Sequence, residues 1–308
     1  MMRYFLGVDV GNTKCHALIS DETGQAVGFG AGGPGNHENL GVEGATTALH
    51  TVVNKAIAQA NISIKDIAGA GFGLAGHDWP SDRPLMDQII NTLGMNAPHD
   101  AVNDAMNGLI AGAKQGWGVS VSAGTSSNAR GRDQHGNIGR MTGNGVFFGE
   151  LGGGVELVYK AVAVISREWS KRGPATILST TLIDHVGAKN VEDFLEGLAR
   201  GRYRVKATDA PIIFEAARDG DAVAQDAITW IGQGLGDLAV GIIHQLHFEE
   251  LDFEVVLAGS LYNGSPLFAE AMRPIIQAVA PGATLVRLDA PPVVGATMLG
   301  LDELYHDV

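Results

Sequence analysis

Two acidic residues stand at positions that could support transfer of a phosphoryl group. Asp9 ends a predicted strand and precedes a Gly-Asn-Thr-Lys turn at 11–14, and Asp104 precedes a predicted helix. Phosphoryl transfer to a hydroxyl needs a cradle for the phosphates, an acid that holds a metal, and a carboxylate that accepts the hydroxyl proton. Turn amides can supply the cradle without cationic side chains. Asp9 suits the metal, and Asp104 suits the base.

Each of these features also has an ordinary structural explanation. Asp9 and its turn are equally consistent with a simple hairpin, because strand–turn–strand patterns are common. Asp104 is a good N-cap for the helix predicted over 105–114, and by sequence alone we favour that role over catalysis. A helix N-terminus lowers a carboxyl pKa, so we expect Asp104 to be ionised and to act only as an acceptor.

A second turn of the same kind follows about 115 residues later. The segment 118–122 reads as a strand, 123–128 as a Gly/Thr/Ser turn, and 129–132 as a second strand. The likeness to the N-terminal segment lies in architecture, with little identity, so an internal duplication is left as one alternative. The best domain boundary is Gln115-Gly116-Trp117-Gly118, which predicts domains over 1–115 and 116–308.

The remaining pattern predicts a mixed α/β fold with helices covering sheets. Helical spacing of apolar residues alternates with short β-branched runs bounded by Gly and Asp. Predicted strands cover 3–9, 15–20, 25–30, 67–74, 101–103, 118–122, 129–132, 253–257 and 283–288. Predicted helices cover 39–60, 84–93, 105–114, 151–170, 176–186, 191–200, 208–218, 222–246, 266–279 and 293–304.

Composition excludes several classes of protein. The net charge is −13 and no Lys/Arg-rich block occurs, which argues against a nucleic-acid partner and against an anionic membrane surface. Cys15 is the single cysteine, so an internal disulfide and a multi-cysteine metal site within one chain are excluded. The N-terminus reaches an acid by position 9 and no apolar run approaches ~20 residues, so we expect no signal peptide, no membrane span and a cytoplasmic location.

The segment 71–76 satisfies the G-x-G-x-x-G pattern of dinucleotide-binding proteins. That pattern should open a helix, but Pro80 and Asp/Ser residues follow it, which favours a loop. We therefore keep a nicotinamide oxidoreductase only as a minor alternative. No Walker motif, H-E-x-x-H or G-x-S-x-G segment occurs in the chain.

Taken together, four segments resemble the sugar kinases of the actin-like ATPase superfamily. The most similar branch is that of the N-acetylglucosamine kinases and the related BadF/BadG/BcrA/BcrD-type ATPases. The segments 7–14 and 122–128 resemble the two phosphate loops, 255–260 the adenosine motif, and 292–296 the final connecting helix. The resemblance implies two actin-like (ribonuclease H-like) α/β domains around a nucleotide cleft, with a last helix that packs back on the N-terminal domain.

The resemblance also implies a set of site residues. Asp9 would organise Mg²⁺, and Asp104 would be the base for the sugar 6-hydroxyl. The implied ATP-binding residues are Gly11, Asn12, Thr13, Lys14, Gly124, Thr125, Ser126, Gly259 and Ser260. The implied sugar-binding residues are Asn36, His37, Ser127, Asn128, Gly143, Asn144, Gly145 and Glu150.

Three of these positions depart from the family pattern. Ser126 replaces a loop glycine, Asn144 an aromatic residue, and Glu150 an aspartate, so the catalytic groups match while the sugar pocket differs. The expected function is an ATP-dependent kinase for an amino sugar, most simply N-acetylglucosamine, with ATP, Mg²⁺ and a small sugar as the ligands. Glucosamine or another hexose derivative, and a non-catalytic sugar or nucleotide sensor, stay open as alternatives, as does a homodimer.

Overall fold

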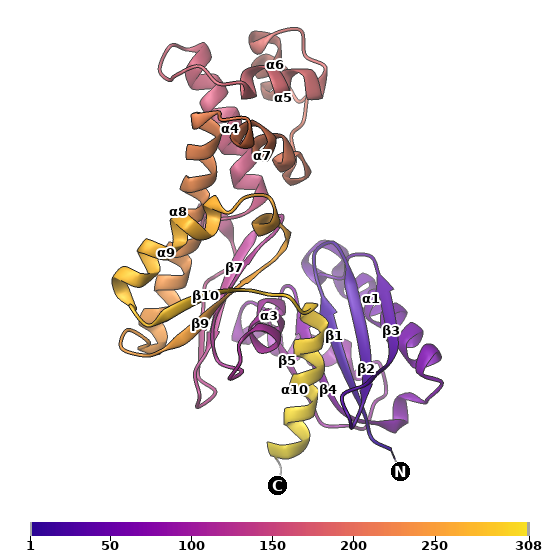
Figure 1. Ribbon diagram of the computed structural model, residues 1–308. Coiled ribbons are helices and arrows are strands. Elements are labelled where there is room, and N and C mark those ends of the chain that lie inside the picture. Colours follow the sequence, from indigo (N-terminus) through magenta and orange to yellow (C-terminus); the bar gives the residue numbers. More distant parts are fainter. Residues whose placement is uncertain (1, 307–308) are drawn as a thin grey trace.

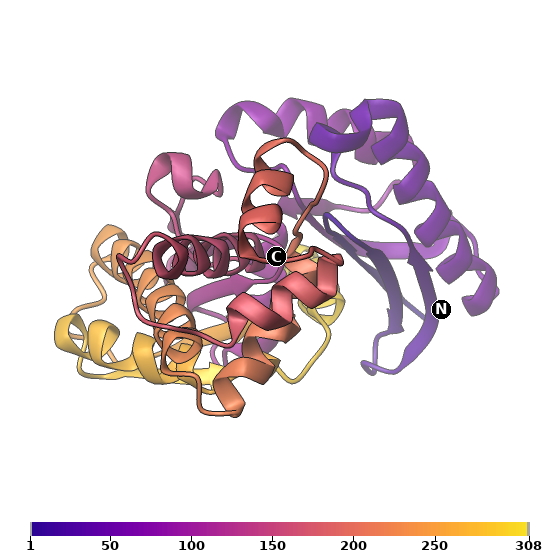
Figure 2. The same cartoon turned by 90° about the horizontal axis from the view of Figure 1, so that it is seen from above.

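The protein contains two five-stranded sheets, each flanked by helices (Figure 1). The computed structural model describes residues 2–306, and of 303–306 only the backbone. Viewed from above in Figure 2, the N-terminal part of the chain (indigo to purple) and the C-terminal part (orange to yellow) lie side by side. The predicted α/β class is therefore confirmed.

The first sheet is formed by the N-terminal part of the chain, in the spatial order β3-β2-β1-β4-β5. β1 pairs antiparallel with β2 and parallel with β4. Helix α1 packs on β2 and β3. The strands are β1 (Tyr4–Val10), β2 (Cys15–Asp21), β3 (Ala26–Gly32), β4 (Ile67–Leu74) and β5 (His99–Val102), and the helices are α1 (His37–Ala60) and α2 (Arg83–Asn91).

The second sheet repeats this order and these strand directions, as β8-β7-β6-β9-β10. β6 pairs antiparallel with β7 and parallel with β9, as β1 does with β2 and β4. The sequence analysis predicted β6 and β7 but missed the short β8. The strands are β6 (Gly118–Ala123), β7 (Ser127–Arg132), β8 (Ile138–Arg140), β9 (Phe253–Ala258) and β10 (Ala283–Arg287). The two halves of the chain thus share one topology.

A helical extension separates β8 from β9. Figure 1 shows α5, α6 and α7 at the end of the molecule farthest from the first sheet, carried there by α4 and the long α8. All the predicted helices are present, with small differences at their ends. Their bounds are α4 (Gly154–Trp169), α5 (Leu178–Val186), α6 (Val191–Ala199), α7 (Ala210–Arg218), α8 (Ala222–Leu246) and α9 (Leu267–Val279).

Two helices connect the halves. α3 (Asp104–Gly112) packs on β4 of the first sheet and on β6, β7 and β9 of the second, and α10 (Pro292–His306) packs on α3, β1 and β4 (Figure 1). The final helix therefore returns to the first sheet. The boundary proposed at 115–118 falls between α3 and β6, and it stays a prediction.

The G-x-G-x-x-G segment has a packing role in this fold. Gly71 and Gly73 lie inside β4, and no helix opens directly after the strand. A Cβ on Gly71 would lie 2.1 Å from the carbonyl oxygen of Ala296 in α10, and one on Gly73 would lie 1.9 Å from the Asn107 amide of α3. These glycines allow the two connecting helices to approach the sheet, so the dinucleotide interpretation is wrong.

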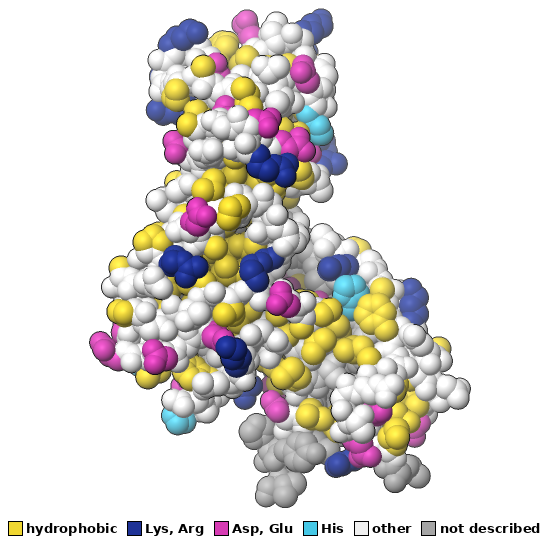
Figure 3. All heavy atoms as spheres, viewed as in Figure 1, with side chains coloured by type: hydrophobic (Ala, Val, Ile, Leu, Met, Phe, Trp, Pro, Cys, Tyr) yellow, Lys and Arg dark blue, Asp and Glu magenta, His cyan; other side chains and the backbone are white. Residues whose placement is uncertain are grey.

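The distribution of basic side chains on the surface matches the lack of a Lys/Arg-rich block in the sequence. On the face in Figure 3, Lys and Arg side chains are scattered singly or in small groups and form no continuous stripe. None of the helices in the described part of the chain is long and apolar enough to cross a membrane.

Candidate active site

Two adjoining cavities lie where the turns after β1 and β6 meet the start of α3. The large cavity, of about 530 Å³, is lined by both turns, by the end of β9 and by the segment before α10. The small cavity, of about 100 Å³, is lined by polar residues of both halves. Asn12, Asp104, Ser122 and Ser126 line both cavities, so the two spaces meet at these four residues.

The first turn is held by its own backbone and by the start of α1. The Gly11 amide donates to the Lys14 carbonyl at 3.0 Å, which leaves Asn12 and Thr13 exposed at the tip. Asn36, the N-cap of α1, donates from Nδ2 to Asn12 Oδ1 at 2.8 Å. The predicted phosphate turn and the predicted sugar-binding asparagine are therefore in direct contact.

The second turn rests on the N-terminus of α4. The Gly124 amide donates to the Ser126 carbonyl at 2.9 Å. The amide of Gly154, the first residue of α4, donates to Gly124 O at 2.8 Å, and that of Val155 donates to Thr125 O at 3.1 Å. These bonds fix the turn and leave the Thr125 and Ser126 side chains exposed toward the large cavity.

Asp9 at the end of β1 is fixed by a residue that sequence reasoning missed. Asn107 is fully buried in α3, and its Nδ2 donates to Asp9 Oδ1 at 2.8 Å. Burial raises the pKa of Asp9, and the Asn107 hydrogen bond and Lys14 act against that rise. Because Asp104 and Asn107 are three residues apart on one helix, they share a face, and this spacing was the available signal.

The residues around Asp9 fit Mg²⁺ bound together with phosphate. Among the described residues no cluster of three or more His, Cys, Asp or Glu side chains could hold a metal alone. Mg²⁺ is commonly held by one or two carboxylates plus substrate phosphates and waters. Asp9 offers one carboxylate in the large cavity, and Asp104 lines the same space. Asn107 Oδ1, which is buried without a hydrogen-bond partner among the described residues, leaves an acceptor beside them.

Asp104 differs in two ways from the sequence expectation. The N-cap of α3 is Asn103, whose Oδ1 accepts from the Ala105 amide at 3.1 Å, so Asp104 is the first helical residue. Burial, and then the charges of Asp9 and Asp78, raise the pKa of Asp104 to about 7. The helix N-terminus was expected to lower this pKa; desolvation and neighbouring acids outweigh it.

An ion pair between the two halves lies beside the small cavity. Arg130 of β7 is only 2% exposed, and its Nη2 lies 2.6 Å from Oδ1 of Asp78, which follows β4. The same oxygen accepts from Asn103 Nδ2 at 3.0 Å and from Asn128 Nδ2 at 3.4 Å. Asp78 thus joins the residue before Asp104 to strand β7. Sequence analysis missed this contact because its partners are 25 to 52 residues apart.

Some of the predicted sugar-binding residues line the small cavity and others do not. Asn36, Ser127, Asn128 and Gly143 line it together with Asp104. Asn128 Oδ1 is buried and has no hydrogen-bond partner in the part of the chain that the structure describes, so it is a ready acceptor.

The remaining predicted sugar ligands point elsewhere. His37 lines a separate apolar cavity of about 20 Å³. The Glu150 carboxylate accepts from the backbone amides of Thr142 at 2.7 Å and Asn144 at 3.1 Å, so it organises its own loop. Asn144 and Gly145 belong to that loop and do not line the small cavity. The roles of these four residues stay predictions.

The far end of the large cavity is formed after β9. Gly259 and Ser260 line it, as the resemblance implied, together with Asn263 and Arg287, which sequence reasoning missed. Arg287 Nη2 donates to Asn263 Oδ1 at 2.6 Å. No motif marks these two residues, because one ends a short 3₁₀ helix and the other ends β10.

Comparison with known proteins places this chain in a family. The model of the BadF/BadG/BcrA/BcrD ATPase family matches residues 6–300. The chain is 24% identical over 304 residues to an N-acetylmuramic acid/N-acetylglucosamine kinase from Clostridium acetobutylicum, covering 98% of this chain and 99% of that protein. It is 24% identical over 312 residues to an N-acetyl-D-glucosamine kinase from Dictyostelium discoideum, covering 97% and 98%.

Solved structures share the fold. A Chromobacterium violaceum protein with a proposed N-acetylglucosamine kinase activity matches with a TM-score of 0.72 at 22% identity, over 96% of this chain and 98% of that one. A ROK family glucokinase from Streptomyces griseus, solved with glucose and AMPPNP, matches with a TM-score of 0.58 at 19% identity, over 96% and 98%. These likenesses confirm the predicted actin-like fold of the sugar kinases, and the family match shows that the chain belongs to the BadF/BadG/BcrA/BcrD ATPase family.

Proposed function

We propose that this protein is an ATP-dependent carbohydrate kinase that phosphorylates the 6-hydroxyl of an amino sugar, N-acetylglucosamine. The observation that carries the proposal is the position of Asp104, which lines both the large cavity and the small polar cavity. A base for phosphoryl transfer must stand where the acceptor hydroxyl meets the terminal phosphate. The names of the two kinase relatives agree with this class of reaction.

The proposed reaction follows from the two cavities. ATP would occupy the large cavity with its phosphates between the turns at Thr13 and Thr125, and the sugar would occupy the small one. The Asp104 carboxylate accepts the proton of the 6-hydroxyl while the oxygen of that hydroxyl attacks the γ-phosphorus. The bond from that phosphorus to the β–γ bridging oxygen breaks, and ADP leaves. A pKa near 7 suits a base that works at neutral pH.

Asp9 is the residue proposed to hold Mg²⁺. When bound, the ion would neutralise charge on the phosphates. The chain's own part is to fix the carboxylate, which the Asn107 hydrogen bond does at 2.8 Å. The turn amides and the Thr13 and Thr125 hydroxyls then position the nucleotide without lysine or arginine clusters, in keeping with the net charge of −13.

The small cavity supports a hydroxylated acceptor. Asn36, Ser127 and Asn128 line it with amide and hydroxyl groups, and such a site penalises analogues that lack the matching hydroxyl. Glucosamine or another hexose derivative is the alternative acceptor. Because the name of the Clostridium relative includes N-acetylmuramic acid, that sugar belongs in the same panel.

An ADP-release assay across N-acetylglucosamine, N-acetylmuramic acid, glucosamine and glucose tests the proposal. We expect the highest kcat/KM with N-acetylglucosamine, and a product whose phosphorus is coupled to the C6 protons in NMR. The Asp104→Asn variant is the control for contaminating kinases. Release of ADP that is independent of every sugar would contradict the proposal and favour the non-catalytic or hydrolytic alternatives. The homodimer and the cytoplasmic location stay predictions.

A further inference from the structure

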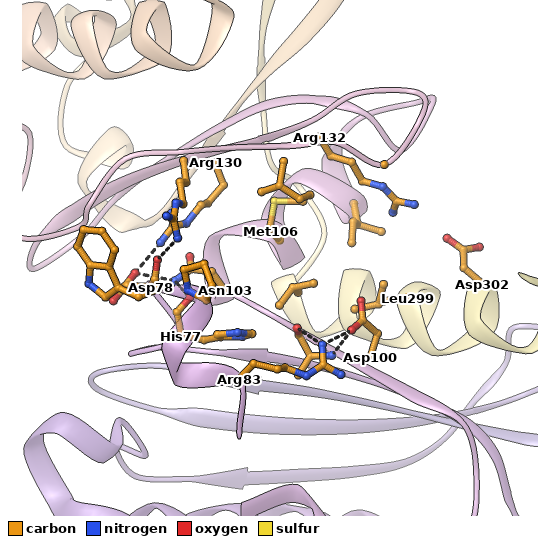
Figure 4. Close-up of a pocket in the computed structure, with 18 residues that line it drawn as sticks. His77, Asp78, Arg83, Asp100, Asn103, Met106, Arg130, Arg132, Leu299 and Asp302 are labelled. Carbon is orange, nitrogen blue, oxygen red and sulfur yellow. Dashed lines mark hydrogen bonds and ion pairs between the residues drawn. The ribbon is translucent and has the colours of Figure 1, made fainter. Parts of the chain in front are cut away.

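A third cavity adjoins the small one and has no part in the proposed reaction (Figure 4). Its volume is about 480 Å³, within the range of roughly 300–1,000 Å³ typical of small-molecule sites. We call it the arginine cavity, because Arg83, Arg130, Arg132 and Arg140 all line it. It shares Asp78 and Asn103 with the small cavity, so one pair of residues borders both spaces.

The arginine cavity draws on both halves of the molecule. Met106 and Ile110 of α3 and Leu299 of α10 line it, which gives it an apolar side. Arg83 comes from the first half and Arg132 from β7 of the second (Figure 4). Arg140 comes from β8 of the second half. A molecule in this space would therefore contact both halves at once.

Strand β7 connects the arginine cavity to the small cavity. Alternate residues of a strand share a face, so Asn128, Arg130 and Arg132 lie on one side of β7. The intervening Gly131 faces α8, since a Cβ there would lie 2.4 Å from a methyl carbon of Ile242. This face runs from the small cavity at Asn128, through the Arg130–Asp78 ion pair, to the arginine cavity at Arg132.

The charges of the arginine cavity are unevenly compensated. Arg83 lies 2.8 Å from both Asp87 and Asp100, and Arg130 is paired with Asp78. Arg140 has no carboxylate partner in the described chain: it donates to the Asp78 carbonyl at 3.1 Å and lies 5.2 Å from the centre of the Trp79 ring.

The guanidinium group of Arg132 has no hydrogen-bond or ion-pair partner among the residues that the structure describes, although its backbone pairs with Gly118 of β6 and Ile138 of β8. In Figure 4 its guanidinium group extends toward Asp302, with which it forms no ion pair. The cavity lining therefore carries four arginines against three acids, Asp78, Asp100 and Asp302, which is an excess of one positive charge. In a chain with a net charge of −13, this local excess favours a negatively charged ligand.

We propose that the arginine cavity binds a small organic anion, with its carboxylate or phosphate at Arg132 and its apolar part against Met106, Ile110 and Leu299. Because the ligand contacts both halves, it stabilises the arrangement in which Arg130 is paired with Asp78. That arrangement holds Asn103 and Asn128 at the small cavity. Binding at the two cavities is then coupled, and by linkage each ligand raises the affinity for the other.

Fluorescence titration measures the binding directly, because Trp79 lines the arginine cavity. Saturating ADP and Mg²⁺ are present throughout, so that the large cavity is occupied. The probes are phenyl phosphate and benzoate, which join an apolar ring to a phosphate or a carboxylate, and inorganic phosphate, which lacks the ring. We expect saturable binding of at least one aromatic anion, at least tenfold tighter than that of inorganic phosphate. The preferred aromatic anion identifies the anionic group.

Two variants and one control assign the signal to this cavity. Arg132→Gln removes a cation that has no partner, and Ile138→Glu places an acid opposite Arg132 at an exposed position. Each is expected to weaken the aromatic anion at least tenfold. Arg204→Gln, at an exposed position between α6 and α7, is the matched control and should bind as the wild type does.

Three outcomes would overturn the proposal. The first is that neither aromatic anion binds saturably. The second is that inorganic phosphate binds as tightly as the aromatic anions. The third is that both variants bind the aromatic anion as tightly as the wild type does. Coupling between the two cavities is tested separately by measuring the KM for the sugar with and without a saturating aromatic anion. We expect the anion to lower this KM at least threefold in the wild type and to have no effect in Arg132→Gln. The binding test needs no turnover, so its result is independent of the proposed kinase activity.

Discussion

The two halves of this molecule share a strand order but differ in the chemistry at equivalent positions. β1 ends with Asp9-Val10 and β6 ends with Ser122-Ala123, so Asp9 and Ser122 each lie two residues before the glycine that opens the following turn. To the two cavities the first half supplies the acids Asp9, Glu38, Asp78 and Asp104, whereas the second supplies hydroxyl and amide groups, with Arg130 paired to Asp78 beside them.

This asymmetry shows how one topology can serve two tasks. Between its third and fourth strands the first half has the single helix α1, while the second half has α4 to α8. Asp9, the proposed metal ligand, is fixed by its hydrogen bond from Asn107. Thr125 and Ser126 of the second turn, which we propose to bind phosphate, are exposed.

The largest expected effect comes from replacing Asp104, the proposed base, which belongs to the first half. Asp104→Asn should lower kcat by roughly 10²- to 10⁴-fold, the usual contribution of a general base. The variant should also fold more stably at pH 8. In the folded wild type Asp104 keeps its proton up to about pH 7, whereas in the unfolded chain it releases the proton near pH 3.8. The free energy of unfolding of the wild type therefore falls as the pH rises from about 3.8 to about 7. Retained turnover in a steady-state assay would contradict the assignment.

The second prediction makes the first half resemble the second. Asp9→Ser places in β1 the residue type found at the equivalent position of β6, and we expect kcat to fall about 100-fold with a higher half-saturating Mg²⁺ concentration, because the proposed metal carboxylate is lost. The measurement is a Mg²⁺ titration at fixed ATP. Ser122→Ala, at the equivalent position, is the matched control and should leave the Mg²⁺ titration unchanged.

The third prediction concerns pH. Since Asp104 must be ionised to accept a proton and its pKa is raised to about 7, kcat/KM should rise with pH up to about 7 and level off above it. At pH 6 the value should be roughly tenfold lower than the plateau. The profile is best measured as kcat/KM for ATP–Mg²⁺, because this parameter reports the pKa of Asp104 in the protein before ATP and Mg²⁺ bind. A profile that is flat between pH 5 and 8 would exclude this group as the titrating base.

The smallest effects should come from the two turns. Thr13→Ala and Thr125→Ala each remove one exposed hydroxyl, and the loss of about 1 kcal/mol of hydrogen bonding predicts roughly a fivefold rise in the KM for ATP. Equal rises in the KM for ATP would mean that both turns bind the nucleotide to the same extent. A rise in only one variant would show that the two turns, despite their shared topology, do not both bind the nucleotide.

Much of the fold was predictable from the sequence, because the signals were local. Alternating apolar residues and Gly-rich turns located the strands on either side of both phosphate turns. Contacts across the sheets left no such signal. Asn107 reaches Asp9 over 98 residues, and Arg130 reaches Asp78 over 52. The pKa of Asp104 was expected in the wrong direction, since burial and neighbouring acids arise only in the folded protein.

The return of α10 to the first sheet also constrains how the chain can fold. Val293, Ala296 and Leu299 are buried by this contact, yet they are synthesised about 220 residues after β4. During synthesis the apolar, glycine-lined face of β1 and β4 therefore stays uncovered until the last helix emerges. Such late, distant contacts slow folding and leave an aggregation-prone surface exposed. A fragment that ends before Pro292 should accordingly aggregate on the ribosome or soon after release.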